Sequence, residues 1–172
     1  WFAVDYNNNL WIYRELYTSK VTADIFARKV LDLESGEYIQ YGVLDSSTWA
    51  KRGDVGPSIA ETMIQQGCRW RQSDRSPKSR ISGKLEIHKR LLVNDKEPGL
   101  RISKNCRNLI RTLGTLPTDD KNPEDVDTNA EDHAYDALRY GCMSRPMHPK
   151  YAQRFKPLFT PEFKPADNKF GY

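Results

Sequence analysis

The residues best suited to chemistry lie in one short segment, 131–140, which holds three acidic residues and a histidine within six positions. The segment predicts a helix, and residues three and four apart are neighbours on a helix, so His133, Asp136 and Tyr140 share one ridge. The adjacent face is small and apolar, which lets the helix pack closely against a sheet; it consists of Ala134, Ala137, Leu138 and Gly141. Carboxylate and imidazole groups at the edge of such a helix suit a divalent metal ion.

The same helix also has a purely structural interpretation. Acidic residues in a first helical turn interact favourably with the positive end of the helix dipole. Asp132, Asp136 and Arg139 could also pair along a solvated face. Because the helix alone favours this interpretation, a metal site needs a second carboxylate from elsewhere in the chain.

Asp45 is the candidate for that second carboxylate. It follows a predicted strand at 38–44, and side chains at strand ends project into the functional crevice of a sheet covered by helices. A strand-end carboxylate and a helix carboxylate could share two metal ions about 4 Å apart, which would activate a water for attack on a phosphodiester. Oxygen ligands favour Mg²⁺ or Mn²⁺ over zinc. Taken alone, Asp45 is better explained as a plain strand-end or helix-capping residue.

The charge distribution of this 172-residue chain points to a polyanionic substrate. Its net charge is +4, but residues 71–90 contain seven basic and two acidic residues, whereas residues 119–132 contain seven acidic residues and one lysine. A basic segment can hold phosphates and an acidic segment can hold metal ions. The candidate DNA-binding residues are Arg71, Arg75, Lys78, Arg80 and Lys84. The alternative for this basic segment is a solvated, mobile loop.

The cysteines and the hydropathy indicate where the protein works. Three widely spaced cysteines without a CxxC pair fit free thiols in a reducing compartment. No segment approaches the roughly 18 to 20 apolar residues of a membrane span, and no signal peptide is visible. We therefore expect a cytoplasmic protein that does not enter a membrane.

The elements that must position these residues predict an α/β fold, a mixed sheet with helices packed on it. Turn residues and hydrophobic periodicity predict strands at 1–5, 10–17, 38–44, 68–72 and 100–102, and helices at 21–33, 58–66, 84–93, 105–113 and 130–143. Pro77 and Gly83 predict irregular backbone over 73–83, and 117–129 is a predicted acidic loop. The folded domain is expected to cover 1–145, followed by a Pro-rich basic tail at 146–172.

Six segments in a fixed order carry a resemblance to a known family. They are YRELY (13–17), LDSSTW (44–49), PSIAETM (57–63), PGLRIS (98–103), NCRNLIRTL (105–113) and EDVDTNAEDHAYDALRYG (124–141). Their order resembles the nuclease domain of the large terminase subunit of tailed bacteriophages and prophages, over most of residues 1–145. The resemblance implies a ribonuclease-H-like fold. It also implies two-metal cleavage of concatemeric double-stranded DNA during genome packaging in the bacterial host cytoplasm.

The resemblance also implies roles for individual residues. Asp45 matches the second essential carboxylate and Asp136 the third, both binding Mg²⁺ or Mn²⁺. His133 would be a metal ligand or would orient the attacking water, and Asp132 would be a weaker ligand or a helix-terminal acid. The family's first aspartate lies on a strand before the hairpin, so we expect that first strand to be missing here and catalysis by this chain alone to be weak. Asp5 is the residue that could substitute for it.

The implied partners are double-stranded DNA, the terminase ATPase domain, the small terminase subunit and the portal or procapsid. A GxxxxGK[ST] phosphate loop does not occur in the sequence, so the packaging ATPase is not expected in this chain. Two alternatives stay open. The chain could be a non-catalytic fragment that binds DNA or docks on a packaging partner, or it could be another ribonuclease-H-like nuclease of the resolvase or transposase type.

Overall fold

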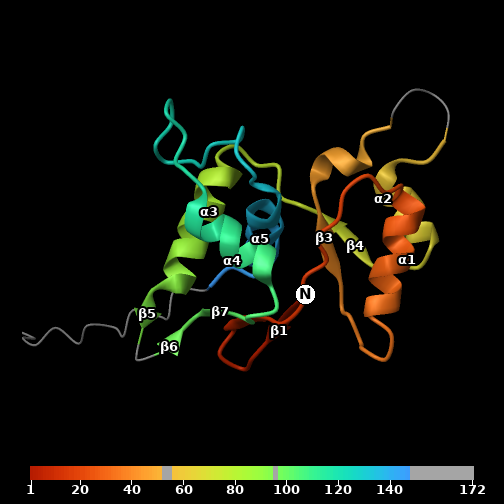
Figure 1. The fold of residues 1–172 in the computed structure, drawn as a ribbon, viewed down its shortest axis with the longest axis horizontal. Coiled ribbons are helices and arrows are strands. Elements are labelled where there is room, and N and C mark those ends of the chain that lie inside the picture. Colours follow the sequence, from red (N-terminus) through yellow and green to blue (C-terminus); the bar gives the residue numbers. More distant parts are fainter. Residues whose placement is uncertain (52–55, 95–96, 148–172) are drawn as a thin grey trace, which may run out of the picture.

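The computed structural model describes residues 1–51, 56–94 and 97–147, and their helices and strands form two groups joined by one helix, α5 (Figure 1). Within these ranges the helices are α1 Ala23–Leu33, the 3₁₀ helix η1 Ser46–Trp49, α2 Ile59–Gln65, α3 Ser79–Leu91, α4 Arg107–Thr115 and α5 His133–Ser144. Helix α5 contacts α3 and α4 in one group and β3 in the other. The central position of α5 matters because it carries most of the predicted site.

The strands are short and form three small sheets in the part of the chain that the structure describes. They are β1 Phe2–Val4, β2 Leu10–Ile12, β3 Gly42–Leu44, β4 Trp70–Gln72, β5 Val93–Asn94, β6 Glu97–Pro98 and β7 Leu100–Ile102. Strand β2 pairs antiparallel with β1 and parallel with β7, which gives a mixed three-stranded sheet. Strands β3 and β4 form a separate parallel pair, and β5 and β6 form a hairpin.

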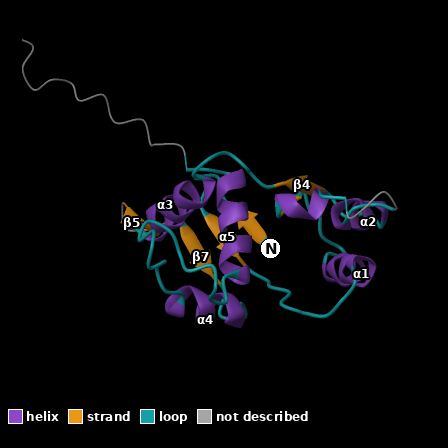
Figure 2. Cartoon of the chain, turned by 90° about the horizontal axis from the view of Figure 1, so that it is seen from above, coloured by secondary structure: helices purple, strands orange, loops and turns teal. Residues whose placement is uncertain are grey.

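The mixed α/β class predicted from the sequence is confirmed. Helices cover a mixed sheet, and Figure 2 shows α5 lying across the strands at the centre of the molecule. None of the helices in the described ranges is long and apolar enough to cross a membrane.

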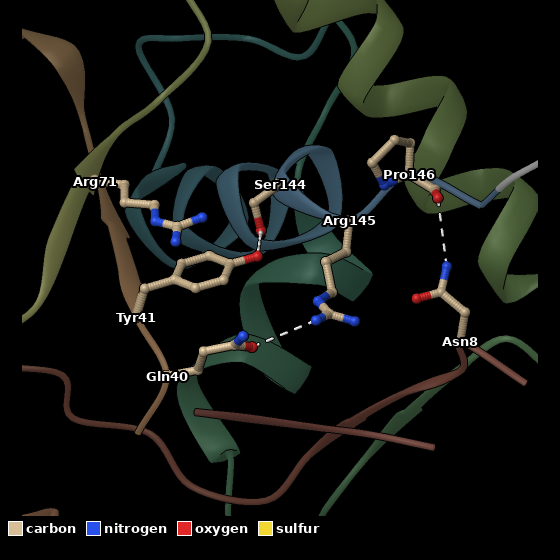
Figure 3. Close-up of a pocket in the computed structure, with 7 residues that line it drawn as sticks. All are labelled: Asn8, Gln40, Tyr41, Arg71, Ser144, Arg145 and Pro146. Carbon is tan, nitrogen blue, oxygen red and sulfur yellow. Dashed lines mark hydrogen bonds between the residues drawn. The ribbon is translucent and has the colours of Figure 1, made fainter. Parts of the chain in front are cut away.

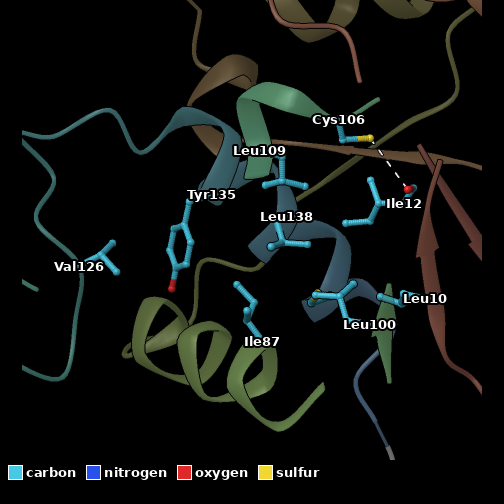
Figure 4. Close-up of a cluster of buried hydrophobic side chains, with 10 residues drawn as sticks. Leu10, Ile12, Ile87, Leu100, Cys106, Leu109, Val126, Tyr135 and Leu138 are labelled. Atoms are coloured by element: carbon cyan, nitrogen blue, oxygen red, sulfur yellow. Dashed lines mark hydrogen bonds between the residues drawn. The ribbon is translucent and has the colours of Figure 1, made fainter. Parts of the chain in front are cut away.

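Two hydrophobic clusters hold the two groups of elements together. The larger cluster packs α3, α4 and α5 against the three-stranded sheet, and its buried members include Ile87, Leu100 and Leu138 (Figure 4). The smaller cluster packs α1 and α2 through Val30 and Met63. Each cluster removes apolar surface from water, the dominant stabilising term for a small domain.

The β1–β2 hairpin was predicted, and its turn is fixed by Asp5. The Asp5 carboxylate accepts hydrogen bonds from the backbone N–H groups of Asn7 at 2.8 Å and Asn9 at 2.9 Å. Asn8 adopts a φ of 63°, a left-handed conformation that asparagine tolerates better than most residues. Asp5 is therefore occupied in the turn.

Helix α3 begins earlier than predicted, so the expectation of irregular backbone up to residue 83 is wrong. The helix starts at Ser79, and Gly83 lies inside it. A Cβ atom at Gly83 would come within 2.4 Å of Cγ of Arg139 on α5, so glycine serves the close approach of two helices rather than a break. As a result, Arg80 lies on a helix and not on irregular backbone.

Of the predicted tail, only residues 146 and 147 are in the described ranges, and residues 148–172 lie outside them. The backbone N–H of Met147 donates to the Glu86 carboxylate at 2.6 Å, and Lys89 donates to the Met147 carbonyl at 2.9 Å. The first residues after α5 are thus held on α3.

Candidate active site at the edge of helix α5

Asp45 lies directly after β3, as predicted, and a hydrogen bond connects it to α5. The Tyr140 hydroxyl donates to Oδ2 of Asp45, and the backbone N–H of Ser47 donates to Oδ1 at 2.6 Å. The second bond makes Asp45 the N-cap of η1, so the capping role and the position at the edge of α5 coincide in one residue. Burial alone would raise the pKa of Asp45, but the bonds from Ser47 and Tyr140 bring it below the ordinary value. The carboxylate is therefore charged at neutral pH.

Asp136 lies one helical turn before Tyr140, a rise of about 6 Å along the helix axis. Asp136 and the tyrosine that binds Asp45 are therefore neighbours on one ridge of α5. The Asp136 carboxylate accepts a hydrogen bond from Nε of Arg139 at 2.9 Å and lies 3.4 Å from Nη1 of Arg80. Two guanidinium groups thus neutralise the carboxylate proposed from the sequence as a metal ligand.

Arg80 contacts three carboxylates in this region. Its Nε lies 2.9 Å from Asp125, and its Nη2 lies 3.8 Å from Asp132, in addition to the contact with Asp136. We call Arg80, Asp125, Asp132 and Asp136 the arginine–carboxylate cluster. Sequence reasoning placed Asp125 only in an acidic loop, and the excess of acids in that loop was the available signal for its role.

His133 and Asp132 lie at the N-terminal end of α5. Asp132 is the N-cap residue and is buried, which agrees with the helix-terminal role considered for it. The His133 side chain is 84 % exposed, and its Nδ1 lies 3.4 Å from Asp132. The structure therefore places the imidazole in solvent and does not bring it into the cluster.

The five predicted DNA-binding residues divide into two sets. Arg71, Arg75 and Lys78 are exposed, and the Arg71 guanidinium stacks 3.9 Å from the centre of a tyrosine ring. Arg80 and Lys84 instead face the acidic loop, where the Lys84 ammonium donates to the backbone carbonyl of Asp125 at 3.0 Å. Only the first set is available to a nucleic acid in this structure.

A polar cavity of about 360 Å³ lies beside the C-terminal end of α5 (Figure 3). Its lining comes from the β1–β2 turn, the residues before β3, β4 and the end of α5: Asn8, Gln40, Tyr41, Arg71, Ser144, Arg145 and Pro146. A second cavity of about 300 Å³ shares Tyr41, Arg71 and Ser144 with it and extends to Tyr140. The two cavities together extend from Tyr140, which donates to Asp45, to Asn8 in the turn of the β1–β2 hairpin.

The donor atoms at this edge fit a hard divalent cation by their chemistry. Asp45 and Asp136 offer partly buried carboxylate oxygens, the ligand type that Mg²⁺ and Mn²⁺ prefer. Within the described ranges, no three His, Cys, Asp or Glu side chains converge as a metal-ligand group. The described residues therefore form no complete ligand set, and Asp136 is already paired with two arginines.

The chain matches no protein-family model, and it has no significant similarity to any curated protein or solved structure with which it was compared.

Proposed function

We propose that the chain is the nuclease domain of a phage or prophage terminase large subunit, a divalent-metal-dependent endonuclease that cleaves concatemeric double-stranded DNA. The observation that carries this proposal is the hydrogen bond from the Tyr140 hydroxyl to Asp45, which ties the carboxylate at the end of β3 to α5, four residues from Asp136. The two acids are 91 positions apart in the sequence, and the family resemblance assigns both to one site.

The strand arrangement supports the ribonuclease-H-like part of the proposal. In the described ranges β1 pairs only with β2, and β3 pairs only with β4, so each strand has one edge without a partner. Figures 1 and 2 place β1 on the side of its sheet nearest to β3 and β4. The polar cavity lies between the hairpin and β3. A ribonuclease-H-like sheet would have one more strand at this place, and the family's first aspartate would lie on it.

In this function, Asp45 and Asp136 would hold Mg²⁺ or Mn²⁺. The bound ions would supply an activated water for attack on a phosphodiester and would stabilise the leaving oxygen. The role of Tyr140 is to fix one carboxylate oxygen of Asp45, while the N–H of Ser47 fixes the other. A carboxylate held at both oxygens keeps one orientation, which favours a constant site geometry.

The partners follow from the proposed family. We propose that the domain works with the terminase ATPase domain, the small terminase subunit and the portal or procapsid, in the bacterial host cytoplasm.

A plasmid-nicking assay in Mn²⁺ tests the proposal. We expect slow conversion of supercoiled to relaxed plasmid, which stops when EDTA removes the metal. Loss of a residue that only hydrogen-bonds a metal ligand reduces activity roughly 10- to 100-fold. Asp136→Ala and Asp45→Asn remove proposed ligands themselves, so each should reduce the nicking rate by more than that. Asp24→Asn, on the exposed first turn of α1, is the matched control and should retain the rate. Nicking that is unaffected by Asp136→Ala would refute the catalytic assignment.

The second candidate is a non-catalytic DNA-binding fragment, which the exposure of Arg71, Arg75 and Lys78 favours. Such contacts bind phosphates and do not read the base sequence. Binding of fluorescent duplex DNA at several salt concentrations would identify this function if nicking is absent. Arg75→Ala should then reduce the slope of log affinity against log salt by about 1, as for one lost phosphate contact.

A further inference from the structure

We propose that Arg80 is an internal counter-cation of the arginine–carboxylate cluster and competes with a divalent cation for Asp136. The proposal rests on the proposed function, because it takes Asp136 as a metal-binding carboxylate. It assigns to Arg80 a role in controlling the site in place of the DNA contact expected from the sequence.

The position of the guanidinium carries the proposal. Arg80 comes from the first turn of α3, and its three nitrogens face acids from two other segments: Asp125 from the acidic loop, and Asp132 and Asp136 from the start of α5. The side chains of the three acids are only 11 to 20 % exposed, so solvent screens their charges incompletely. Three partly buried carboxylates this close together require a cation, and Arg80 supplies it.

A buried hydroxyl next to the cluster gives an independent indication that another ligand can enter. Tyr135 is only 4 % exposed, and its hydroxyl has no hydrogen-bond partner within residues 1–51, 56–94 and 97–147. Figure 4 shows its ring extending from α5 toward α3, the helix that carries Arg80. Tyr135 directly precedes Asp136 on α5. An unsatisfied buried hydroxyl is costly and is rare in a completed site.

The other charges around Asp136 are consistent with competition. Arg139 on α5 also pairs with Asp136, at 2.9 Å, so the carboxylate already faces two positive groups. The Lys84 ammonium is close by on α3 and donates to backbone carbonyls of the acidic loop. A divalent ion at Asp136 would meet repulsion from the Arg80 guanidinium in addition to that from Arg139 and Lys84. Removing the Arg80 charge therefore strengthens cation binding.

Direct titration with Mn²⁺, followed by the loss of the electron paramagnetic resonance signal of the free ion, tests this competition. The Arg80→Gln protein should bind Mn²⁺ about tenfold more tightly than the wild type, equivalent to about 1.4 kcal/mol. Lys29→Gln removes one positive charge from an exposed side chain on α1, and it should change the affinity less than about twofold. The double variant Arg80→Gln/Asp136→Asn should lose the gain.

The stability of the cluster provides a second readout. Mn²⁺ should raise the melting temperature of Arg80→Gln more than that of the wild type, because tighter binding to the folded state gives more stabilisation. If Arg80→Gln does not fold, as judged by circular dichroism, Arg80→Lys takes its place. A single ammonium cannot bridge three carboxylates as a guanidinium fork does, so the Mn²⁺ affinity of this variant should also rise.

Two results would overturn the competition, and they separate it from the proposed function. Equal Mn²⁺ affinity in the wild type and Arg80→Gln, with binding lost in Asp136→Asn, refutes the role of Arg80 and leaves the metal site intact. Absence of Mn²⁺ binding in both the wild type and Arg80→Gln refutes the role of Arg80 together with the metal site.

Discussion

Asp45 shows how single residues define the candidate site. Its two carboxylate oxygens accept from donors on different elements, the backbone of η1 and the Tyr140 hydroxyl on α5. Hydrogen bonds to a charged group are stronger than those between neutral groups. The Asp45 carboxylate therefore connects β3 to α5 and is held in one orientation at the same time.

The lowered pKa of Asp45 predicts how stability depends on pH. A carboxyl whose pKa is lower in the folded chain stabilises the fold above its unfolded pKa of about 4, and this contribution is lost as the pH falls through the folded value. Asp45→Asn should therefore lower the free energy of unfolding by about 1 to 2 kcal/mol at pH 7. The difference in the free energy of unfolding between Asp45→Asn and the wild type should become smaller below about pH 4. Urea unfolding between pH 7 and pH 3 measures it, and a difference independent of pH would contradict the role of the charge.

The sequence suggested the two acids of the candidate site but not their neighbours. Asp45 and Asp136 could be proposed from motif order, because a strand end and a helix ridge are local features. The pairing of Arg80 with Asp125 could not, since it depends on how the acidic loop folds over α3. The exposure of His133 likewise depends on how α5 is rotated about its own axis relative to the other elements. The spacing of residues along the helix does not determine that rotation.

At the scale of elements, α5 is positioned by its small residues. Ala134 and Leu138 pack in the larger hydrophobic cluster, as the predicted apolar face requires, whereas Ala137 is exposed. Gly141 allows the closest contact: a Cβ there would lie 2.2 Å from Cζ of Phe2 on β1. The small face thus allows α5 to pack closely against the sheet, and this packing determines how far Asp136 and Tyr140 lie from the strands.

The contact at Gly141 predicts opposite effects for two glycine substitutions in helices. Gly141→Ala should destabilise the fold by about 1 to 3 kcal/mol, the usual cost of overpacking, because the Phe2 ring has to move. Gly114→Ala in α4 is the matched control. Nothing lies within 4 Å of its added methyl group, so it should stabilise by about 0.5 kcal/mol through the better helix propensity of alanine. Thermal unfolding of both variants measures this, and stabilisation by Gly141→Ala would refute the close contact.

The elements themselves were predictable where local signals were strong. Turn residues identified the β1–β2 hairpin, and periodicity identified five helices, four of them to within three residues at each end. The pairing of β2 with β7 was not predictable, because the two strands are separated by 87 positions and no local pattern fixes their register. The start of α3 was missed because Gly83 resembles a helix breaker, although its purpose is contact with Arg139.

At the scale of the whole molecule, buried polar contacts join the same elements that the larger hydrophobic cluster packs together. Arg90 on α3 is fully buried, and it donates to the Glu86 carboxylate at 2.9 Å and to the Asn8 carbonyl at 3.0 Å. Its third contact is a hydrogen bond to the Arg145 carbonyl, just after α5. One side chain therefore holds the hairpin turn, α3 and the residues that follow α5. Because Asn8 and Arg145 also line the polar cavity, Arg90 supports one wall of it.

Arg90→Met should therefore destabilise the whole fold strongly. Methionine replaces the aliphatic part of the Arg90 side chain but carries no charge. The Glu86 carboxylate, which is 9 % exposed, is then left without its counter-charge. Removing one partner of a buried pair costs about 3 to 5 kcal/mol. Arg28→Met is the control, because the Arg28–Asp24 pair on α1 has the same spacing but is exposed, and its loss should cost less than about 1 kcal/mol. Urea unfolding compares the two variants. Similar small losses in both would mean that the Arg90 contacts do not join these segments, and that hydrophobic packing alone sets the position of α5 over the strands.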